Sequence, residues 1–345
     1  MQTTDKLMEY IQDSPSPYHA AAAAAARLEA AGFTRLEESA PWALSSGPCC
    51  YTTRTQRSLI ALRLPGGPPE GWRMTAAHSD SPAFCVKNDA LGGGKRYVRL
   101  AVEGYGGMNC ASWLDRPLTV AGRAVVRAPA GVEGRLVYLD RDLLTIPSLA
   151  IHQQRDVNRG HDYNAQKDMQ PLYALGGGPS LPALLAEELG VDAGDILATD
   201  LVLCPRQAPV RIGPEGEFFQ APRIDDLGCA YATLEGFLSA KGTERFGQLY
   251  CLFDNEEVGS GPRQGAMSSF LPDVLTRIGE ALGLPAQARR QALAGRLLLS
   301  ADNGHAVHPH FPEKADPATR LHPNGRAVLQ YSPHPHYHPT GLTAG

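Results

Sequence analysis

Several features that define whole classes of proteins are missing or scarce in this sequence. No apolar run approaches the roughly 20 residues that a helix needs to cross a bilayer, and the N-terminus lacks the charged-then-apolar pattern of a secretion signal. The 345 residues carry a formal net charge of only −4, which gives no reason to expect nucleic acid or an anionic membrane as a partner. We therefore expect a soluble protein with no nucleic-acid or membrane partner.

Cysteine occurs without the spacing of a disulfide framework or a cysteine zinc site. The seven cysteines are odd in number and scattered, and none forms a Cys-x-x-Cys pair. Reduced, mostly buried thiols explain this pattern best. The sequence accordingly predicts a cytoplasmic location.

The composition is that of an ordinary globular protein, with 43% hydrophobic and 20% charged residues. Strand-like stretches dominate after Gly92, and the middle of the chain lacks the paired metal-ligand residues that both flanks carry. After Asp226, strands and helices alternate, which predicts a mostly parallel central sheet with helices on both faces. We therefore expect an α/β catalytic domain formed by residues 1–92 and 213–345, interrupted by an inserted β-rich domain formed by residues 93–212.

Local patterns predict the individual elements. Ser16 precedes Pro17 and an alanine-rich run, which predicts a helix with Ser16 as its N-cap and Gly32 at its end. Ser180 is expected to cap a second helix in the same way. The strands are expected at 58–62, 74–77, 97–102, 118–127, 135–139, 196–204, 248–253 and 296–300, and further helices at 181–189, 228–240, 270–282 and 285–293.

Four groups of metal-ligand residue types each follow an apolar run that has the pattern of a strand. Strand ends converge at one edge of an open α/β sheet, where such folds place their chemistry. A mixture of imidazole and carboxylate suits hard and borderline divalent ions. The groups, which together predict a metallohydrolase, are His78-Ser79-Asp80, Asp225, Asn255-Glu256-Glu257 and Asp302.

Each group also has a structural explanation when it is taken alone. A His-x-Asp tripeptide is common in surface turns, and an acidic run is common in solvated loops. Capping of a helix can be the whole role of Asp225 or Asp226. The coincidence of all four groups favours the metal site, in which His78 binds the ion and Asp80 orients its ring. One of the paired glutamates would then bind metal while the other acts as general base.

A set of longer motifs, specific in combination, runs from about residue 14 to about residue 330. The motifs are Ser14-Pro-Ser-Pro-Tyr-His19, Ala77-His-Ser-Asp-Ser-Pro82, Gly104-Tyr-Gly-Gly107, Trp113-Leu-Asp-Arg-Pro-Leu-Thr-Val-Ala-Gly-Arg123, Ile146-Pro-Ser-Leu-Ala-Ile-His152, Pro222-Arg-Ile-Asp-Asp-Leu227, Asp254-Asn-Glu-Glu-Val-Gly-Ser260 and Ser300-Ala-Asp-Asn-Gly-His-Ala-Val-His-Pro309. Through them the chain resembles the M18 metallopeptidases, the aspartyl aminopeptidase family.

This resemblance implies a zinc-aminopeptidase-like catalytic domain that removes acidic residues from the N-termini of peptides. Two metal ions are implied, typically Zn²⁺, with Mn²⁺ or Co²⁺ as alternatives. By position, one ion takes His78, Asp225 and Asp302. The second ion shares Asp225 and takes Glu257 and a histidine from the C-terminal part of family members.

The resemblance also assigns roles to residues that bind no metal. Glu256 matches the general base, which acts on a water molecule activated by the two metals, and Asp80 matches the residue behind His78. His152 matches a histidine that reaches from the inserted domain toward the active site of a neighbouring subunit. Family members assemble through this inserted lid and oligomerisation domain into closed homo-oligomers, commonly dodecamers, which restrict access to small peptides.

The chain departs from the family at its C-terminal end. Family members continue through further strands and helices that include the last metal-ligand histidine, so the chain is expected to be C-terminally truncated. Gln330 stands where the family has a lysine linked to the acidic side chain of the substrate. Three tail histidines, His334, His336 and His338, are the remaining candidates for the missing ligand. Two alternatives therefore stay open: a weakly active or inactive homologue that still oligomerises and binds metal in part, and a related exopeptidase with neutral specificity.

Overall fold

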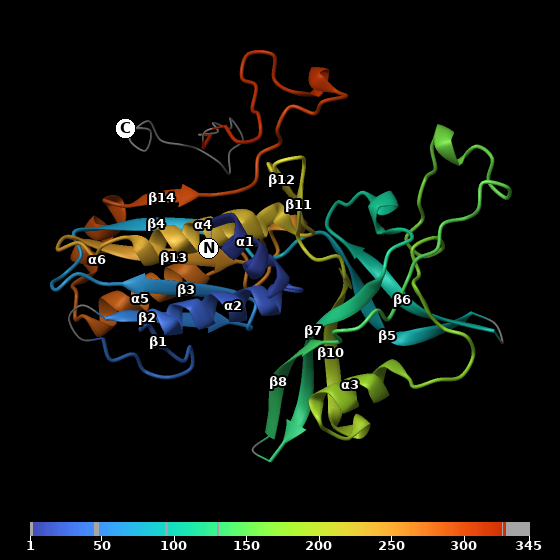
Figure 1. Ribbon diagram of the computed structural model, residues 1–345. Helices are drawn as coiled ribbons and strands as arrows, with labels where there is room; N and C mark the ends of the chain where they lie inside the picture. The colour runs from blue at the N-terminus through green and yellow to red at the C-terminus, as the bar shows by residue number, and fades with distance from the viewer. Residues whose placement is uncertain (1–2, 45–47, 94–95, 130, 326, 329–345) are drawn as a thin grey trace.

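The computed structural model describes residues 3–44, 48–93, 96–129, 131–325 and 327–328. Figure 1 shows a layered α/β part and, beside it, a second part built around a separate sheet. Gln330 and the three tail histidines lie outside the described residues, so the predictions that rest on them stay predictions.

The α/β part is built on a six-stranded sheet with the order β1-β2-β3-β13-β4-β14. Three neighbouring pairs, β1–β2, β13–β4 and β4–β14, are parallel, whereas β3 is antiparallel to both of its neighbours. The predicted mostly parallel sheet is thus confirmed. The strands are β1 (Thr34–Arg35), β2 (Cys49–Arg54), β3 (Ser58–Arg63), β4 (Gly71–His78), β13 (Phe246–Phe253) and β14 (Leu297–Ser300).

Helices cover both faces of this sheet because successive side chains of a strand point in opposite directions. Leu59 and Ala61 of β3 pack in one core with three helices, α1, α2 and α4. Ile60 and Leu62 of the same strand pack in a second core with α5 and α6. The helices are α1 (Thr3–Gln12), α2 (Pro17–Ala30), α4 (Ile224–Ser239), α5 (Phe270–Ala281) and α6 (Ala286–Ala294).

The second part contains a six-stranded sheet with the order β8-β7-β10-β5-β6-β9 and antiparallel neighbours throughout. It has its own apolar core, to which one helix contributes. β5 begins at Ala83, before the predicted boundary at residue 93, yet already pairs in this sheet, so the exact domain boundaries are a proposal. The elements are β5 (Ala83–Gly93), β6 (Tyr97–Tyr105), β7 (Leu118–Ala128), β8 (Gly131–Tyr138), β9 (Leu172–Ala174), α3 (Leu181–Leu189) and β10 (Ile196–Pro205), followed by a small hairpin of β11 (Val210–Ile212) and β12 (Phe218–Gln220).

Ser16 and Ser180 both occupy the N-cap positions that the sequence predicts, but only Ser180 makes the capping hydrogen bond. The Ser180 side chain accepts a hydrogen bond from the backbone N–H of Ala183, as predicted for a cap. Ser16 is also the N-cap of its helix, but its side chain makes no capping hydrogen bond. Its hydroxyl instead lies 2.8 Å from Nδ1 of His19, because that ring competes for it.

The helices and the cysteines bear on the expected class of protein. Among the described residues, no helix has both the length and the apolar character required to span a bilayer. All seven cysteines are free thiols.

His19 gives a testable dependence of stability on pH. Burial, reinforced by the charge of Arg223, lowers the pKa of His19 to about 4. Between about pH 6.5 and about pH 4, His19 is therefore protonated in the unfolded chain but neutral in the folded chain. The free energy of unfolding consequently decreases as the pH falls through this range, by at most about 1.4 kcal/mol per pH unit. In urea unfolding, His19→Gln should flatten this decline. The matched change at the exposed His322 should leave it as in the wild type, and an equal decline in all three proteins would contradict the assignment.

Candidate metal and catalytic site

The candidate site lies at the carboxyl edge of the central sheet. β4 and β13 run parallel, so that His78 at the end of β4 pairs with Phe253 at the end of β13. β14 runs parallel to β4 on its other side and ends at Ser300. Residues that follow these strands therefore emerge together, as the sequence predicted.

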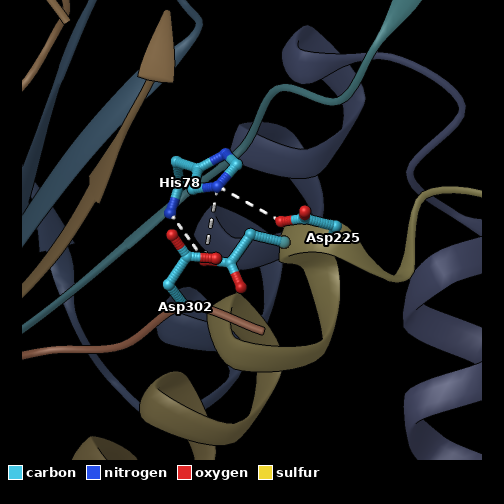
Figure 2. A group of neighbouring side chains, drawn as sticks. His78, Asp225 and Asp302 are labelled. Carbon is cyan, nitrogen blue, oxygen red and sulfur yellow. Dashed lines mark hydrogen bonds and ion pairs between the residues drawn. The ribbon is translucent and has the colours of Figure 1, made fainter. Parts of the chain in front are cut away.

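Four residues form a compact cluster there: His78, Asp225, Asp226 and Asp302. Each offers a ligand atom within 4.8 Å of those of the other three, and Figure 2 shows three of the side chains converging. Nε2 of His78 lies 3.5 Å from Oδ1 of Asp225 and 3.9 Å from Oδ2 of Asp226. Because His78 and Asp226 are buried while Asp225 and Asp302 are exposed, the cluster is open to solvent on one side.

Asp226 connects the three elements that meet at this cluster. One carboxylate oxygen accepts a hydrogen bond from the backbone N–H of His78 (3.1 Å), and the other accepts one from Nδ2 of Asn303 (2.9 Å). Neither Asp225 nor Asp226 is the N-cap of α4, a position that Arg223 occupies. The backbone of both aspartates is non-helical within α4, so a capping role for them stays an alternative, but the Asp226 carboxylate also holds the ends of two strands together.

Asp80 is a fully buried carboxylate that receives hydrogen bonds from separate parts of the chain. The hydroxyl of Tyr105, at the end of β6, donates to one oxygen at 2.7 Å. The backbone N–H groups of Glu256 and Glu257 donate at 3.2 Å each, and Nδ1 of His78 lies 3.3 Å from the carboxylate. Burial alone would raise the pKa of Asp80, but hydrogen bonds from His78 and Tyr105 outweigh it and lower that pKa.

The acidic groups around His78 shift one another's titration. Burial would lower the pKa of His78, but hydrogen bonds with Asp225 and Asp80 raise it to about 11. Burial, together with the charge of Asp225, raises the pKa of Glu257 to about 7, and burial also raises the pKa of Glu256. Each shift reduces an excess of negative charge. A divalent cation would reduce it too, and one imidazole with several carboxylates is a donor set that fits such an ion.

Four predicted site residues, Asp80, Glu256, Glu257 and His152, lie outside the cluster. The backbone of Glu257 is fixed on Asp80, but its carboxyl is not among the clustered ligand atoms found in the described part of the chain. His152 lies exposed in a turn of the second part. The structure thus brings His78, Asp225 and Asp302 together with Asp80 behind them, while the second ligand set and the role of His152 stay predictions.

Sequence reasoning assigned no role to Tyr105, Asn255 or Arg57. Nδ2 of Asn255 donates to the Tyr105 hydroxyl (3.0 Å), and Gln264 donates to the Asn255 side chain (2.6 Å). Arg57 forms an ion pair with the buried Asp254 (2.5 Å) directly before the acidic loop. The sequence contains one signal for Tyr105, its position between two glycines after a predicted strand. Glycines allow the backbone to lie close to another part of the chain, but they do not indicate which residue Tyr105 contacts.

Removing the Tyr105 hydroxyl tests this support. Tyr105→Phe leaves the ring in place and removes one hydrogen-bond donor to Asp80. We therefore expect about tenfold weaker zinc binding, because loss of a group that orients a metal ligand typically reduces metal affinity by about that factor. The matched change Tyr97→Phe, at an exposed position of the same strand, should leave zinc affinity as in the wild type. Titration with a zinc indicator measures both variants, and equal affinities would contradict the proposed support.

The chain is similar in sequence to known proteins over nearly its whole length. The family model described as "Aminopeptidase I zinc metalloprotease (M18)" matches residues 10–344. A curated relative from Clostridium acetobutylicum, "Probable M18 family aminopeptidase 2", is 36% identical over 342 residues, which cover 96% of this chain and 79% of the relative.

Solved structures agree with the sequence comparison. One of them, "Structure of Chaetomium thermophilum mApe1", matches with a TM-score of 0.85 at 30% identity, over 92% of this chain and 78% of that one. Another, "Structure of S. cerevesiae mApe1 dodecamer", matches with a TM-score of 0.76 at 27% identity, over 90% and 73%. The chain belongs to the M18 family of metalloaminopeptidases, hydrolases that act on peptide bonds.

Proposed function

We propose that this protein is a metal-dependent aminopeptidase that releases N-terminal residues from peptides, with Glu256 as its general base. The observation that carries the proposal is the buried Asp80 carboxylate, which contacts both the ring of His78 and the backbone of Glu256. Metallohydrolases need a ligand set and a base held in a fixed relation. Membership of the M18 family supports the reaction class.

The metal proposal rests on the donor set. His78, Asp225 and Asp302 would hold one ion, and Asp225 with Glu257 would contribute to a second. A bound divalent ion supplies Lewis-acid polarisation of the scissile carbonyl and lowers the pKa of a nearby water molecule. The family description supports zinc, and the same donors also accept Mn²⁺ or Co²⁺.

The chain's own residues would position and move the proton. The Glu256 carboxyl is half-buried, and burial raises its pKa, in the direction that suits a base working near neutral pH. Glu256 would accept a proton from the attacking water and donate it to the leaving amine. With Nδ1 of His78 turned toward Asp80, Nε2 faces the carboxylates of the cluster.

Three finer features belong to the same proposal. We propose a preference for N-terminal Asp or Glu, which the resemblance to the aspartyl aminopeptidase family implies. We propose a homo-oligomer, in which the exposed His152 reaches a neighbouring site; the likeness to the yeast mApe1 dodecamer supports this. A cytoplasmic location is supported by the free thiols.

The direct test is release of the N-terminal residue from peptides that begin with Asp, Glu or Leu. The purified protein is assayed with added Zn²⁺, Mn²⁺ or Co²⁺. We expect metal-dependent cleavage, fastest for Asp or Glu, and a loss of about 100-fold or more in kcat for Glu256→Gln, because a general base contributes at least that much.

Glu244→Gln is the matched control, since Glu244 is exposed and precedes β13, whereas the site follows that strand. It should cleave as the wild type does. Absence of cleavage with every metal, from protein shown by circular dichroism to be folded, would contradict the proposed function. Equal loss in both variants would contradict the role of Glu256.

A further inference from the structure

A cavity of about 470 Å³ joins the candidate site to the second part of the molecule. Asp225 and Tyr105, which belong to the site, line it together with Trp113 and Arg116, which follow β6 in the second part. Cavities of this size hold a whole small ligand, roughly 300–1,000 Å³ being the usual range. The cavity therefore has room for a short peptide rather than for one side chain alone.

Three arginines line this cavity, and two of them have partners within the chain. Arg57 forms ion pairs with Asp200 (3.2 Å) and Asp254 (2.5 Å). Arg223 donates to the backbone oxygens of Ser14 and Ile11 and to Sγ of Cys204. Their charges are therefore already used in holding the fold together.

Arg116 differs from the other two. It makes no hydrogen bond or ion pair with any residue that the structure describes, and its Nε is buried without a partner. Asp115 and Asp142 line a second pocket together with Arg116, but both have other partners. Asp115 accepts a hydrogen bond from the backbone N–H of Ser148 (2.8 Å), and Asp142 forms an ion pair with Arg206 (3.2 Å). Among the described residues, Arg116 is thus the arginine of this cavity whose charge has no partner, and it is available to an anion that arrives from solution.

We propose that Arg116 binds the C-terminal carboxylate of a short peptide whose N-terminal residue lies at the candidate metal site. The proposal rests on the proposed function and names its substrate class: short peptides with a free C-terminus. A guanidinium pairs with a carboxylate through two parallel hydrogen bonds, which gives both affinity and orientation. The cavity has room for a short peptide, and this favours a C-terminal carboxylate as the partner of Arg116.

Kinetics with Leu-Ala-Ala and its C-terminal amide test the proposal. For the wild type we expect kcat/KM to be about tenfold or more higher for the free acid than for the amide. A factor of this size corresponds to the free energy of one hydrogen bond between charged groups. Arg116→Gln should remove this difference, and Arg116→Lys, which keeps the charge without the planar fork, should retain part of it. Arg141→Gln, at an exposed arginine outside the cavity, should keep the wild-type ratio.

A second pair of peptides distinguishes the two sources of a carboxylate. Asp-Ala-Ala amide and Asn-Ala-Ala amide differ only in the charge of the N-terminal side chain. We expect Arg116→Gln to leave the preference between them as in the wild type. A loss of that preference, with the difference between acid and amide unchanged, would overturn the assignment of Arg116 to the C-terminus.

Binding measurements separate this proposal from the proposed function. With zinc present, isothermal titration of Glu256→Gln protein should give about tenfold or more tighter binding of Leu-Ala-Ala than of its amide, and Arg116→Gln in the same background should abolish the difference. Equal dissociation constants, or no binding of either peptide, would overturn the role of Arg116. Loss of peptide hydrolysis with the binding difference intact would contradict only the proposed function.

Discussion

The site depends on one buried carboxylate, that of Asp80. A carboxylate with no exposed surface requires donors for its oxygens, and it obtains them from β6 and from the loop after β13. The same group lies against the ring of His78 at the end of β4. Satisfying a single buried charge thus fixes the candidate ligand His78, the proposed base and the second part of the molecule relative to one another.

Asp226 is a second buried carboxylate that holds His78 in place. It accepts hydrogen bonds from the backbone of His78 and from Asn303, which follows β14. The two buried aspartates, Asp80 and Asp226, therefore hold His78 in place, whereas Asp225 and Asp302 are exposed. This division explains how a concentration of acidic residues is compatible with a stable fold and still leaves carboxylates available to a cation.

Periodicity and residue type predicted the parts of the structure that depend on local pattern. His78 and Asp302 could be predicted to meet because each follows a strand and strand ends converge in an α/β sheet, whereas Asp225 reaches the cluster from the start of α4 and not from a strand of that sheet. The boundary of the inserted part was less predictable, because β5 continues from the α/β part without a change in composition. The roles of Tyr105, Asn303 and Arg57 could not be predicted either, since each depends on a partner distant in sequence.

The central claim is that His78, Asp225 and Asp302 bind a metal ion on the support of Asp80. The most direct measurement is anomalous diffraction at the zinc edge from crystals of the protein grown with zinc. The account predicts a peak at about 2.0–2.2 Å from Nε2 of His78 and from carboxylate oxygens of Asp225 and Asp302, the usual zinc distances. Ordered zinc at other positions, with no peak among these three side chains, would contradict the account.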